Sequence, residues 1–405
     1  MSLRPSKSSW SDLPMFFGEA HCALGEELAK SLAVHDPALH AVDEVAARMG
    51  ALGLYELLVP RALGGRELGE RERGEGQIDV RALCVAREAL AYVSPLADSV
   101  LAVQGLAAYP LVLVPTFRRR AEVLEEVVAG TRVGGFALTE PEAGSDVASM
   151  RTTARRDGGG DGWVLDGEKV FISNVGIASH FVVFANADPA AGKRGISAFF
   201  VEAGAPGLTL EPIATAVDHP LGRLVMDGCR VPYDALLGDV GQGMRLALGT
   251  LDVFRTSVGA AAVGMAQRAL DETVMRVTKR VQFGQRLSEF QLTQAALADM
   301  ATDVDAARLL VCRAAWLKDR GAKAPGEVAM AKMFATEAAQ RVIDRAVQLH
   351  GGLGVVDGTV VERLYREVRP LRIYEGTTEI QKLILGATLV RQSKQAGEGR
   401  EGGES

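Results

Sequence analysis

The sequence LRIYEGTTEIQ, residues 371–381, decides how the rest of the chain is interpreted. A single carboxylate, Glu375, stands between Tyr374 and Gly376, and two threonines and an apolar run follow. A threonine hydroxyl can cap the helix that this run predicts, and Glu379 in its first turn suits the positive end of the helix dipole. We therefore expect Glu375 in a loop just outside a helix N-terminus, beside a glycine that permits close backbone approach.

Length and composition limit the class of protein. The 405 residues exceed one ordinary core and predict two or three domains. With 48% hydrophobic and 24% charged residues, the composition is typical of a soluble globular protein. A net charge of −6 argues against nucleic acid or an anionic membrane as the main partner. The uncharged run 99–117 is interrupted by Gln104, Gly105, Pro110 and Pro115, which favours a buried helix followed by its exit loop.

The cysteines and histidines indicate neither a disulfide nor a metal site. Cys22, Cys84, Cys229 and Cys312 lack C-x-x-C spacing, and the six histidines form no zinc-binding helical pattern. No secretory signal is recognisable at the start of the sequence. We therefore expect reduced thiols, no metal and a cytoplasmic location.

Hydrophobic periodicity divides the chain into parts. Residues 1–130 are mostly helical, residues 131–240 form short strands separated by turns, and residues 241–395 form four long helices. The strands predict a small β-sandwich or barrel, with hairpin connections at 157–162 and at Asp166-Gly167. The glycine- and glutamate-rich end, 396–405, is expected to be disordered. The helices predicted most clearly are 40–52, 80–92, 244–279, 292–319, 328–349 and 379–392.

Three further motifs accompany the glutamate loop. FALTEPEAGSD (136–146) and GEKVFISN (167–174) lie in the β-rich part, and QLHGGLG (348–354) follows the third long helix of the C-terminal part. In this order the segments resemble the acyl-CoA dehydrogenases, flavoenzymes that desaturate acyl thioesters. The resemblance covers almost the whole chain and is weakest before about residue 80. It implies a mainly α fold with an N-terminal helical domain, a middle β-domain and a C-terminal four-helix bundle.

The resemblance implies FAD as the cofactor. Thr139 and Ser173 would hydrogen-bond the edge of the isoalloxazine, and Phe171 would cover one ring face, where relatives often carry tryptophan. Arg280 would meet the cofactor's phosphates from a neighbouring subunit. The residues alone leave simpler interpretations open: a structural turn at Thr139, a dipole-compensating arginine at a helix end, and a glycine C-cap at 351–354. The contacts implied are Phe136, Leu138, Thr139, Gly144, Ser145, Phe171, Ser173, Arg280, Gln282, Phe283, Gln291, Gln348, Gly351, Gly352, Thr377 and Gln381.

The resemblance also implies the reaction. Glu375 would remove the α-proton of an acyl-CoA, FAD N5 would accept the β-hydride, and an electron-transfer flavoprotein would receive the electrons. Relatives that place the base in the first bundle helix have it at the position of Phe254, which cannot accept a proton. Glu375 therefore has no rival. The substrate contacts implied are Ser145, Asp252, Arg255, Tyr374 and Gly376, although Asp252 and Arg255 fit an i,i+3 helix pair nearly as well.

Some alternatives remain open. Segment 214–222, ATAVDHPLG, departs from the lysine-, arginine- and serine-containing stretch with which many relatives hold CoA. A thioester on an acyl carrier protein is therefore a second hypothesis for the substrate; CoA comes first because no broad basic face is visible for an acidic carrier. A flavin oxidase or monooxygenase of the same fold and a non-enzymatic helical scaffold are further hypotheses, and the retained Glu375 speaks against the oxidase. The resemblance also implies a homo-oligomer, a dimer of dimers (homotetramer), with neither a nucleic-acid nor a membrane partner.

Overall fold

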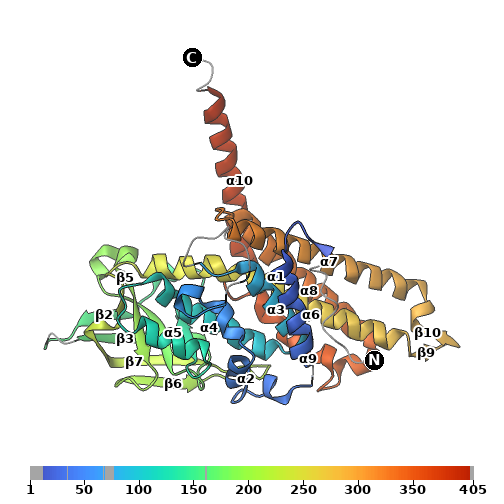
Figure 1. Ribbon diagram of the computed structural model, residues 1–405, viewed down its shortest axis with the longest axis horizontal. Helices are drawn as coiled ribbons and strands as arrows, with labels where there is room; N and C mark the ends of the chain where they lie inside the picture. Colours follow the sequence, from blue (N-terminus) through green and yellow to red (C-terminus); the bar gives the residue numbers. More distant parts are fainter. Residues whose placement is uncertain (1–11, 34, 67, 69–76, 160–161, 402–405) are drawn as a thin grey trace. The chain divides into compact units, whose positions relative to one another are not determined.

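The structure, a computed structural model, describes residues 12–33, 35–66, 68, 77–159 and 162–401. They belong to two compact units, whose segments can be followed by colour in Figure 1. The bundle unit comprises Met1–Leu32, Val80–Pro95 and Arg255–Ser405, and the sheet unit comprises Ala33–Asp79 and Leu96–Phe254. The N-terminal helices are divided between the two units, so the expected domain boundary near residue 130 stays a prediction.

Four long helices form the core of the bundle unit. The helix α7 packs along α8, and α8 packs against α10. The helix α6 approaches α7 and α8 at Gly259, where an added Cβ would lie 2.7 Å from Val311 Cγ2 and 3.5 Å from the Ala331 carbonyl oxygen. The predicted four-helix arrangement is therefore present. The helices of this unit are α1 (Glu19–Ser31), α3 (Val80–Val93), α6 (Gly243–Val277, from residue 255 onward), α7 (Gln291–Asp319), α8 (Pro325–His350), α9 (Val360–Glu367) and α10 (Thr378–Glu401).

The boundaries of α8 follow from its sequence. Proline at the first helical position lacks only an N–H that would have no partner there. The buried residues recur every three or four positions, as in an amphipathic helix. At the other end Gly351 has φ +62° and ψ −143°, which a residue with a side chain avoids, so the predicted glycine C-cap is confirmed.

The last helix is longer than the sequence predicts. Disorder is expected from residue 396, but α10 continues to Glu401, and residues 402–405 lie outside the described part of the chain. No proline interrupts the helix, and each residue added to a formed helix gains one backbone hydrogen bond. That gain offsets the low helix propensity of the glycines near its end.

Helices of the sheet unit are α2 (Val45–Ala51), most of α4 (Pro95–Leu113) and α5 (Arg120–Val128). The first is shorter than the predicted helix 40–52. A separate 3₁₀ turn, Pro37–Leu39, precedes it because the Asp36 carboxylate accepts the N–H of Ala38 and caps that turn.

Two helices among the described residues, α4 and α6, are long and apolar enough to cross a membrane. However, 83% of the most apolar window of α4 and 67% of that of α6 are buried inside the structure. A core helix needs the same composition as a membrane helix, so burial accounts for it. The buried helix predicted within 99–117 is therefore confirmed as α4, which begins at Pro95 and continues past Pro110.

Eight strands form one sheet in the order β6-β7-β3-β2-β4-β5-β8, and β1 pairs with β4. The pair β1–β4 is parallel, whereas β3 is antiparallel to both β2 and β7. A two-stranded hairpin, β9–β10, lies in the bundle unit. The bounds are β1 Gly134–Ala137, β2 Thr153–Arg156, β3 Gly162–Ser173, β4 His180–Asn186, β5 Ile196–Glu202, β6 Leu208–Pro212, β7 Leu221–Pro232, β8 Leu236–Leu237, β9 Val281–Gln282 and β10 Gln285–Arg286.

One of the two predicted hairpin turns is wrong. The connection at 157–162 joins β2 to β3 as expected, although residues 160–161 lie outside the described residues. Asp166-Gly167 instead lies inside β3, where the pairing with β7 shifts register. Gly167 has φ +142°, and an added Cβ would lie 2.7 Å from Thr152 Cα. A β-bulge needs the same permissive glycine as a turn does, which explains the error.

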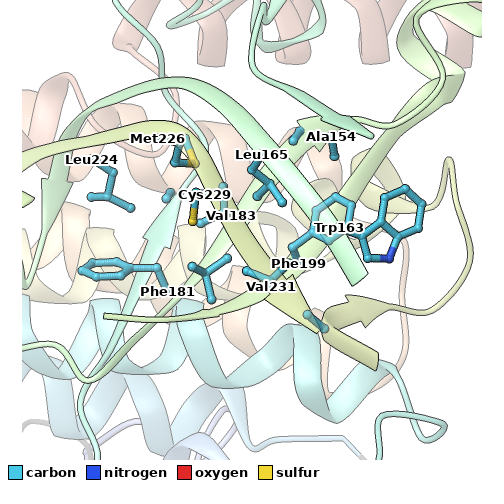
Figure 2. Packing of buried hydrophobic residues seen from close by; sticks show 14 of the residues in the cluster. Ala154, Trp163, Leu165, Phe181, Val183, Phe199, Leu224, Met226, Cys229 and Val231 are labelled. Atoms are coloured by element: carbon cyan, nitrogen blue, oxygen red, sulfur yellow. The ribbon is translucent and has the colours of Figure 1, made fainter. Parts of the chain in front are cut away.

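Aromatic and aliphatic side chains fill the core of the sheet unit, as Figure 2 shows. Trp163 and Phe199 meet edge to face with ring centroids 5.3 Å apart. Cys229 is fully buried in this cluster, and all four cysteines are free thiols. One aromatic residue of β3 departs from this pattern, since the side chain of Phe171 is 62% exposed.

Candidate active site

Glu375 lies in a turn between the 3₁₀ segment Arg369–Arg372 and α10, as predicted. The φ of Glu375 is +52° and that of Gly376 is +91°. The Thr377 hydroxyl oxygen accepts the N–H of Ile380 at 3.4 Å, so Thr377 caps the helix. The predicted loop at a helix N-terminus is therefore confirmed.

Left-handed backbone conformation marks several predicted site residues. Within the described residues, the non-glycine residues with positive φ are Phe171, Asn174, Phe283 and Glu375, with φ between +51° and +68°. Each such residue costs about 1–3 kcal/mol, and such conformations gather at functional sites. Three of the four were singled out from the sequence as cofactor or catalytic residues.

Side chains from three helices hold the carbonyl groups of the glutamate turn. Arg255 Nε of α6 donates to the Glu375 carbonyl oxygen at 3.0 Å. Lys332 Nζ of α8 and Gln381 Nε2 of α10 both donate to the Gly376 carbonyl oxygen at 2.9 Å. In this structure, Arg255, expected to contact substrate, and Gln381, expected to contact the flavin, support the turn.

A carboxylate of α8 fixes the two ends of the same turn. Glu337 Oε1 accepts a hydrogen bond from Arg372 Nε at 2.8 Å and another from the Thr378 hydroxyl at 2.7 Å. Arg372 precedes the turn and Thr378 opens α10. Glu337 therefore holds the residues on either side of the turn, while Arg255, Lys332 and Gln381 hold its carbonyl groups. Together these contacts maintain the strained backbone conformation of Glu375.

Lys332 is one of the residues of this site that could not be singled out from the sequence. Its side chain is fully buried, and burial lowers its pKa to about 8, against the opposing attraction of Glu375. The available signal was its position: Lys332 falls among Val328, Ala331 and Ala335 on the buried face of α8. A lysine on such a face needs a specific partner.

In the sheet unit, a buried ion pair shapes the segment that contains Thr139. Lys169 Nζ lies 2.7 Å from Glu140 Oε1 and donates to the Leu138 carbonyl oxygen at 3.2 Å. The Glu140 carboxylate also accepts the backbone N–H groups of Arg151 and Thr152, at 2.6 and 3.0 Å. The Val170 N–H donates to the Thr139 carbonyl oxygen. These contacts join the two motifs that were quoted as flavin-facing.

The pKa shifts of that pair follow from its burial. Burial lowers the pKa of Lys169 to about 8, against the attraction of Glu140. Burial acts to raise the pKa of Glu140, but Lys169 and the backbone N–H of Arg151 outweigh it and the net pKa is lowered. Both groups are therefore charged at neutral pH. In the sequence, Glu140 and Lys169 stand within these two motifs, and no pattern there predicts a role for either residue.

Ser173, at the end of β3, has a histidine partner that the sequence did not predict. Its hydroxyl oxygen lies 2.9 Å from His219 Nε2. His219 belongs to the atypical segment 214–222, and burial lowers its pKa to about 4, so the imidazole is neutral at pH 7. The unusual loop therefore reaches one of the two side chains expected at the flavin edge.

The other expected contacts differ in exposure. Phe136 packs on Phe184 with ring centroids 5.0 Å apart, and Leu138 is buried. Gly144 and Ser145 are exposed in the loop that follows. Partial burial is found for Asp252, Tyr374, Gly376 and Thr377, whereas Arg280, Gln282, Gln291 and Gln348 are exposed.

The site residues fit FAD by three observations. Phe171 and Phe283 hold exposed aromatic rings, 62% and 95% accessible, on strained backbone, which suits side chains kept for a planar ligand. At Gly351 and Gly352 an added Cβ would meet nothing within 4 Å, so the backbone there is open to a close ligand. Gln381 Oε1 is buried and has no hydrogen-bond partner in the described structure.

Comparison with known proteins identifies the family. Models of the acyl-CoA dehydrogenase middle domain and C-terminal domain match residues 135–229 and 241–390. A probable acyl-CoA dehydrogenase of Mycobacterium leprae is 37% identical over 399 residues, which cover 94% of this chain and 99% of the relative. The chain belongs to the acyl-CoA dehydrogenase family. Members of this family are FAD-dependent oxidoreductases, and the observed helical and sheet arrangement is the fold of the family.

Two further similarities within the family bear on partners and direction. A 3-(aryl)acrylate reductase of Clostridium sporogenes is 35% identical over 390 residues, covering 93% of this chain and all of the relative. A chain in a solved structure described as the electron transferring flavoprotein of Acidaminococcus fermentans has 33% identity and a TM-score of 0.84. That match covers 93% of this chain and 99% of the other.

Proposed function

We propose that this acyl-CoA dehydrogenase desaturates an acyl-CoA thioester between Cα and Cβ, with Glu375 as the base. The supporting observation is the glutamate turn, in which strained backbone at Glu375 is held by Arg255, Lys332 and Gln381. A positioned carboxylate is suited to removing a proton α to a thioester carbonyl. Phe254, at the alternative position for a base, is fully buried and carries no proton acceptor.

The residues of the chain have distinct tasks in this reaction. The Glu375 carboxylate takes the α-proton, and the three donors to its turn keep that carboxylate in place. FAD, when bound, supplies the two-electron acceptor for the β-hydride. Phe171, Thr139 and Ser173 of the sheet unit are the residues we assign to the flavin ring, and Phe283, Gly351 and Gly352 of the bundle unit are those we assign to the rest of the dinucleotide.

The direct test of the base is Glu375→Gln. Glutamine keeps the size and hydrogen-bonding capacity of the side chain but does not accept a proton at neutral pH. We expect a yellow, folded protein whose kcat falls at least about 10³-fold. The same change at the neighbouring exposed glutamate, Glu379→Gln, serves as the control. Substantial turnover by the glutamine variant would move the base to another residue.

The direction of the reaction is a second question, because one relative is named a reductase. The same residues serve both directions, with Glu375 returning a proton to Cα when an enoyl thioester is reduced. We favour dehydrogenation with an electron-transfer flavoprotein as acceptor, in line with the structural match described by that name. A panel of saturated and α,β-unsaturated acyl-CoAs, assayed with artificial acceptors and donors, separates the two directions. Rapid reoxidation of the reduced enzyme by oxygen would instead favour a flavin oxidase.

For the substrate carrier we propose CoA over an acyl carrier protein. The acidic net charge of −6 gives no general attraction for an acidic carrier protein. The atypical segment 214–222 argues the other way, because it lacks the lysine, arginine and serine with which many relatives hold CoA. The ratio of kcat/KM for one acyl group on the two carriers decides the question. A strong preference for the carrier-protein form would overturn the choice of CoA and leave the role of Glu375 intact.

Assembly is a further part of the proposal: a cytoplasmic homotetramer in which Arg280 meets the FAD phosphates of a neighbouring subunit. Around it the hairpin β9–β10 exposes apolar side chains, Phe283 at 95% and Leu292 of the adjoining α7 at 86%. Arg280→Ala should lower FAD content after dialysis and loosen the oligomer together, as light scattering after size exclusion would measure. Unchanged flavin content would favour the simpler role of Arg280 at the helix end.

A further inference from the structure

Lys332 is a fully buried lysine whose hydrogen bond to the glutamate turn the proposed function uses, but whose charge has no part in the reaction as proposed. It lies in the N-terminal half of α8, and its Nζ donates to the Gly376 carbonyl oxygen, one residue after the proposed base. A buried ammonium group is costly unless nearby groups compensate its charge. The groups that compensate the charge of Lys332 therefore indicate what this residue does.

The charged groups that act on Lys332 are Glu375, Arg255, Glu337 and Glu379. Glu375 makes the largest electrostatic attraction, while Arg255 opposes the charge of Lys332. Glu337 is engaged by Arg372 and Thr378, and Glu379 is exposed to solvent. The carboxylate that balances the buried lysine most strongly is therefore the proposed base itself.

We propose that Lys332 is a positioning residue for Glu375, holding the turn through the Gly376 carbonyl group and keeping the Glu375 carboxylate ionised through its positive charge. This inference rests on the proposed role of Glu375 as the base. An ionised carboxylate is ready to accept the α-proton, and a neighbouring cation extends the ionised form to lower pH.

The pH dependence of activity follows from this arrangement. The pKa of Lys332 is lowered to about 8 because its burial outweighs the attraction of Glu375. Below that pH the lysine is charged and favours the ionised Glu375. Without the charge, Glu375 binds its proton more tightly, so the acid limb of the kcat/KM profile moves to higher pH. A shift of one pH unit lowers kcat/KM about tenfold on that limb.

The test compares Lys332→Met with Lys332→Arg. Methionine keeps an apolar stem of similar length and removes the charge and the donor, whereas arginine keeps both. We expect the acid limb of kcat/KM for the methionine variant to move up by about one pH unit, with arginine recovering part of the shift. A methionine variant whose kcat falls equally at all pH values, with the limb unmoved, would reduce Lys332 to a structural residue and overturn the inference.

A second measurement needs no turnover. In the flavin-free protein, Lys332 has its lowered pKa of about 8 when folded and an ordinary value near 10.5 when unfolded. The folded protein releases this proton first, so the stability of the wild type relative to Lys332→Met rises as pH increases from 8 to 10.5. Parallel curves of thermal unfolding temperature against pH would show that folding does not lower the pKa of Lys332, which contradicts the desolvated ammonium group beside Glu375 that the inference requires.

Including Glu375→Gln in the same series separates the inference from the proposed function. If the glutamine variant keeps full turnover, Glu375 is not the base and the proposed function fails. If the glutamine variant is inactive and the methionine variant keeps the wild-type acid limb, only the role of Lys332 fails. If the glutamine variant is inactive and the limb moves as expected, both stand.

Discussion

Two buried lysines, one in each unit, support two different segments of predicted site residues in different ways. Lys332 and Lys169 are both fully buried, and burial lowers the pKa of each to about 8. Each donates a hydrogen bond to a backbone carbonyl of a site loop, Gly376 in one case and Leu138 in the other. The difference lies in the carboxylate that balances the charge. Lys169 has a dedicated partner, Glu140, at 2.7 Å, whereas Lys332 relies most on Glu375.

This difference separates a structural ion pair from one that is coupled to chemistry. The Glu140 carboxylate also accepts hydrogen bonds from two backbone N–H groups, so both of its oxygens are engaged in joining the 138–152 segment to β3. Glu375 must remain able to bind a proton during the proposed reaction. Changes at Lys169 should therefore appear first in stability, and changes at Lys332 first in the pH dependence of activity.

The largest stability effect is expected for Lys169→Met. The change leaves the Glu140 carboxylate buried beside an apolar side chain, and removing one member of a buried pair typically costs about 3–5 kcal/mol. Chemical denaturation of the flavin-free protein measures the loss. The double change Lys169→Met with Glu140→Gln should recover part of it, because the unpaired charge is then gone. A single variant within about 1 kcal/mol of the wild type would show that the pair contributes little to stability.

Glu140→Gln is expected to have a smaller effect with a distinct pH dependence. Glutamine can still accept the Lys169 hydrogen bond, and the uncompensated lysine can lose its proton because burial already lowers its pKa to about 8, so we expect a loss of about 1.5–3 kcal/mol. The folded pKa of Glu140 lies below its ordinary value of 4.5, so its contribution is present above pH 4.5 and is lost as pH falls through the folded value. The stability difference between wild type and variant should therefore shrink in acid. A difference that stays constant down to pH 3 would rule out ionised Glu140 as its source.

The sequence was most informative where chemistry is local. The turn at Glu375, its threonine cap, both ends of α7 and the C-terminal end of α8 depend on residues adjacent in the chain, and these predictions were confirmed, whereas α8 begins three residues before the predicted start at 328. The β-bulge at Gly167 was taken for a turn because both need a glycine with positive φ. The α10 extension was missed because local composition understates the gain from propagating a formed helix.

Contacts between distant residues could not be read from the sequence. Lys332 and Gly376 are 44 positions apart, and Ser173 and His219 are 46 apart. Glu140 and Lys169 stood in motifs that were quoted, but their pairing depends on how β3 is placed beside the 138–152 segment. A lysine on a buried face predicts that it has a compensating partner, but the sequence does not show which residue that partner is. These three contacts are therefore known only from the structure.

Phe283→Asn is expected to have the smallest effect, and it tests whether backbone strain is maintained for a ligand. Phe283 and Gly284 have φ of +51° and +80° in the turn of the β9–β10 hairpin, which matches a turn with two left-handed central residues. The phenylalanine side chain is 95% exposed, so the flavin-free protein gains little from it. Asparagine tolerates the left-handed region better. The flavin-free variant should be more stable by about 0.5–1 kcal/mol, yet retain FAD less well after dialysis.

Leu292→Asn, which changes a similarly exposed side chain in α7 without positive φ, should show no such gain. If Phe283→Asn destabilises the flavin-free protein and leaves FAD retention unchanged, the ring serves the fold and not the cofactor.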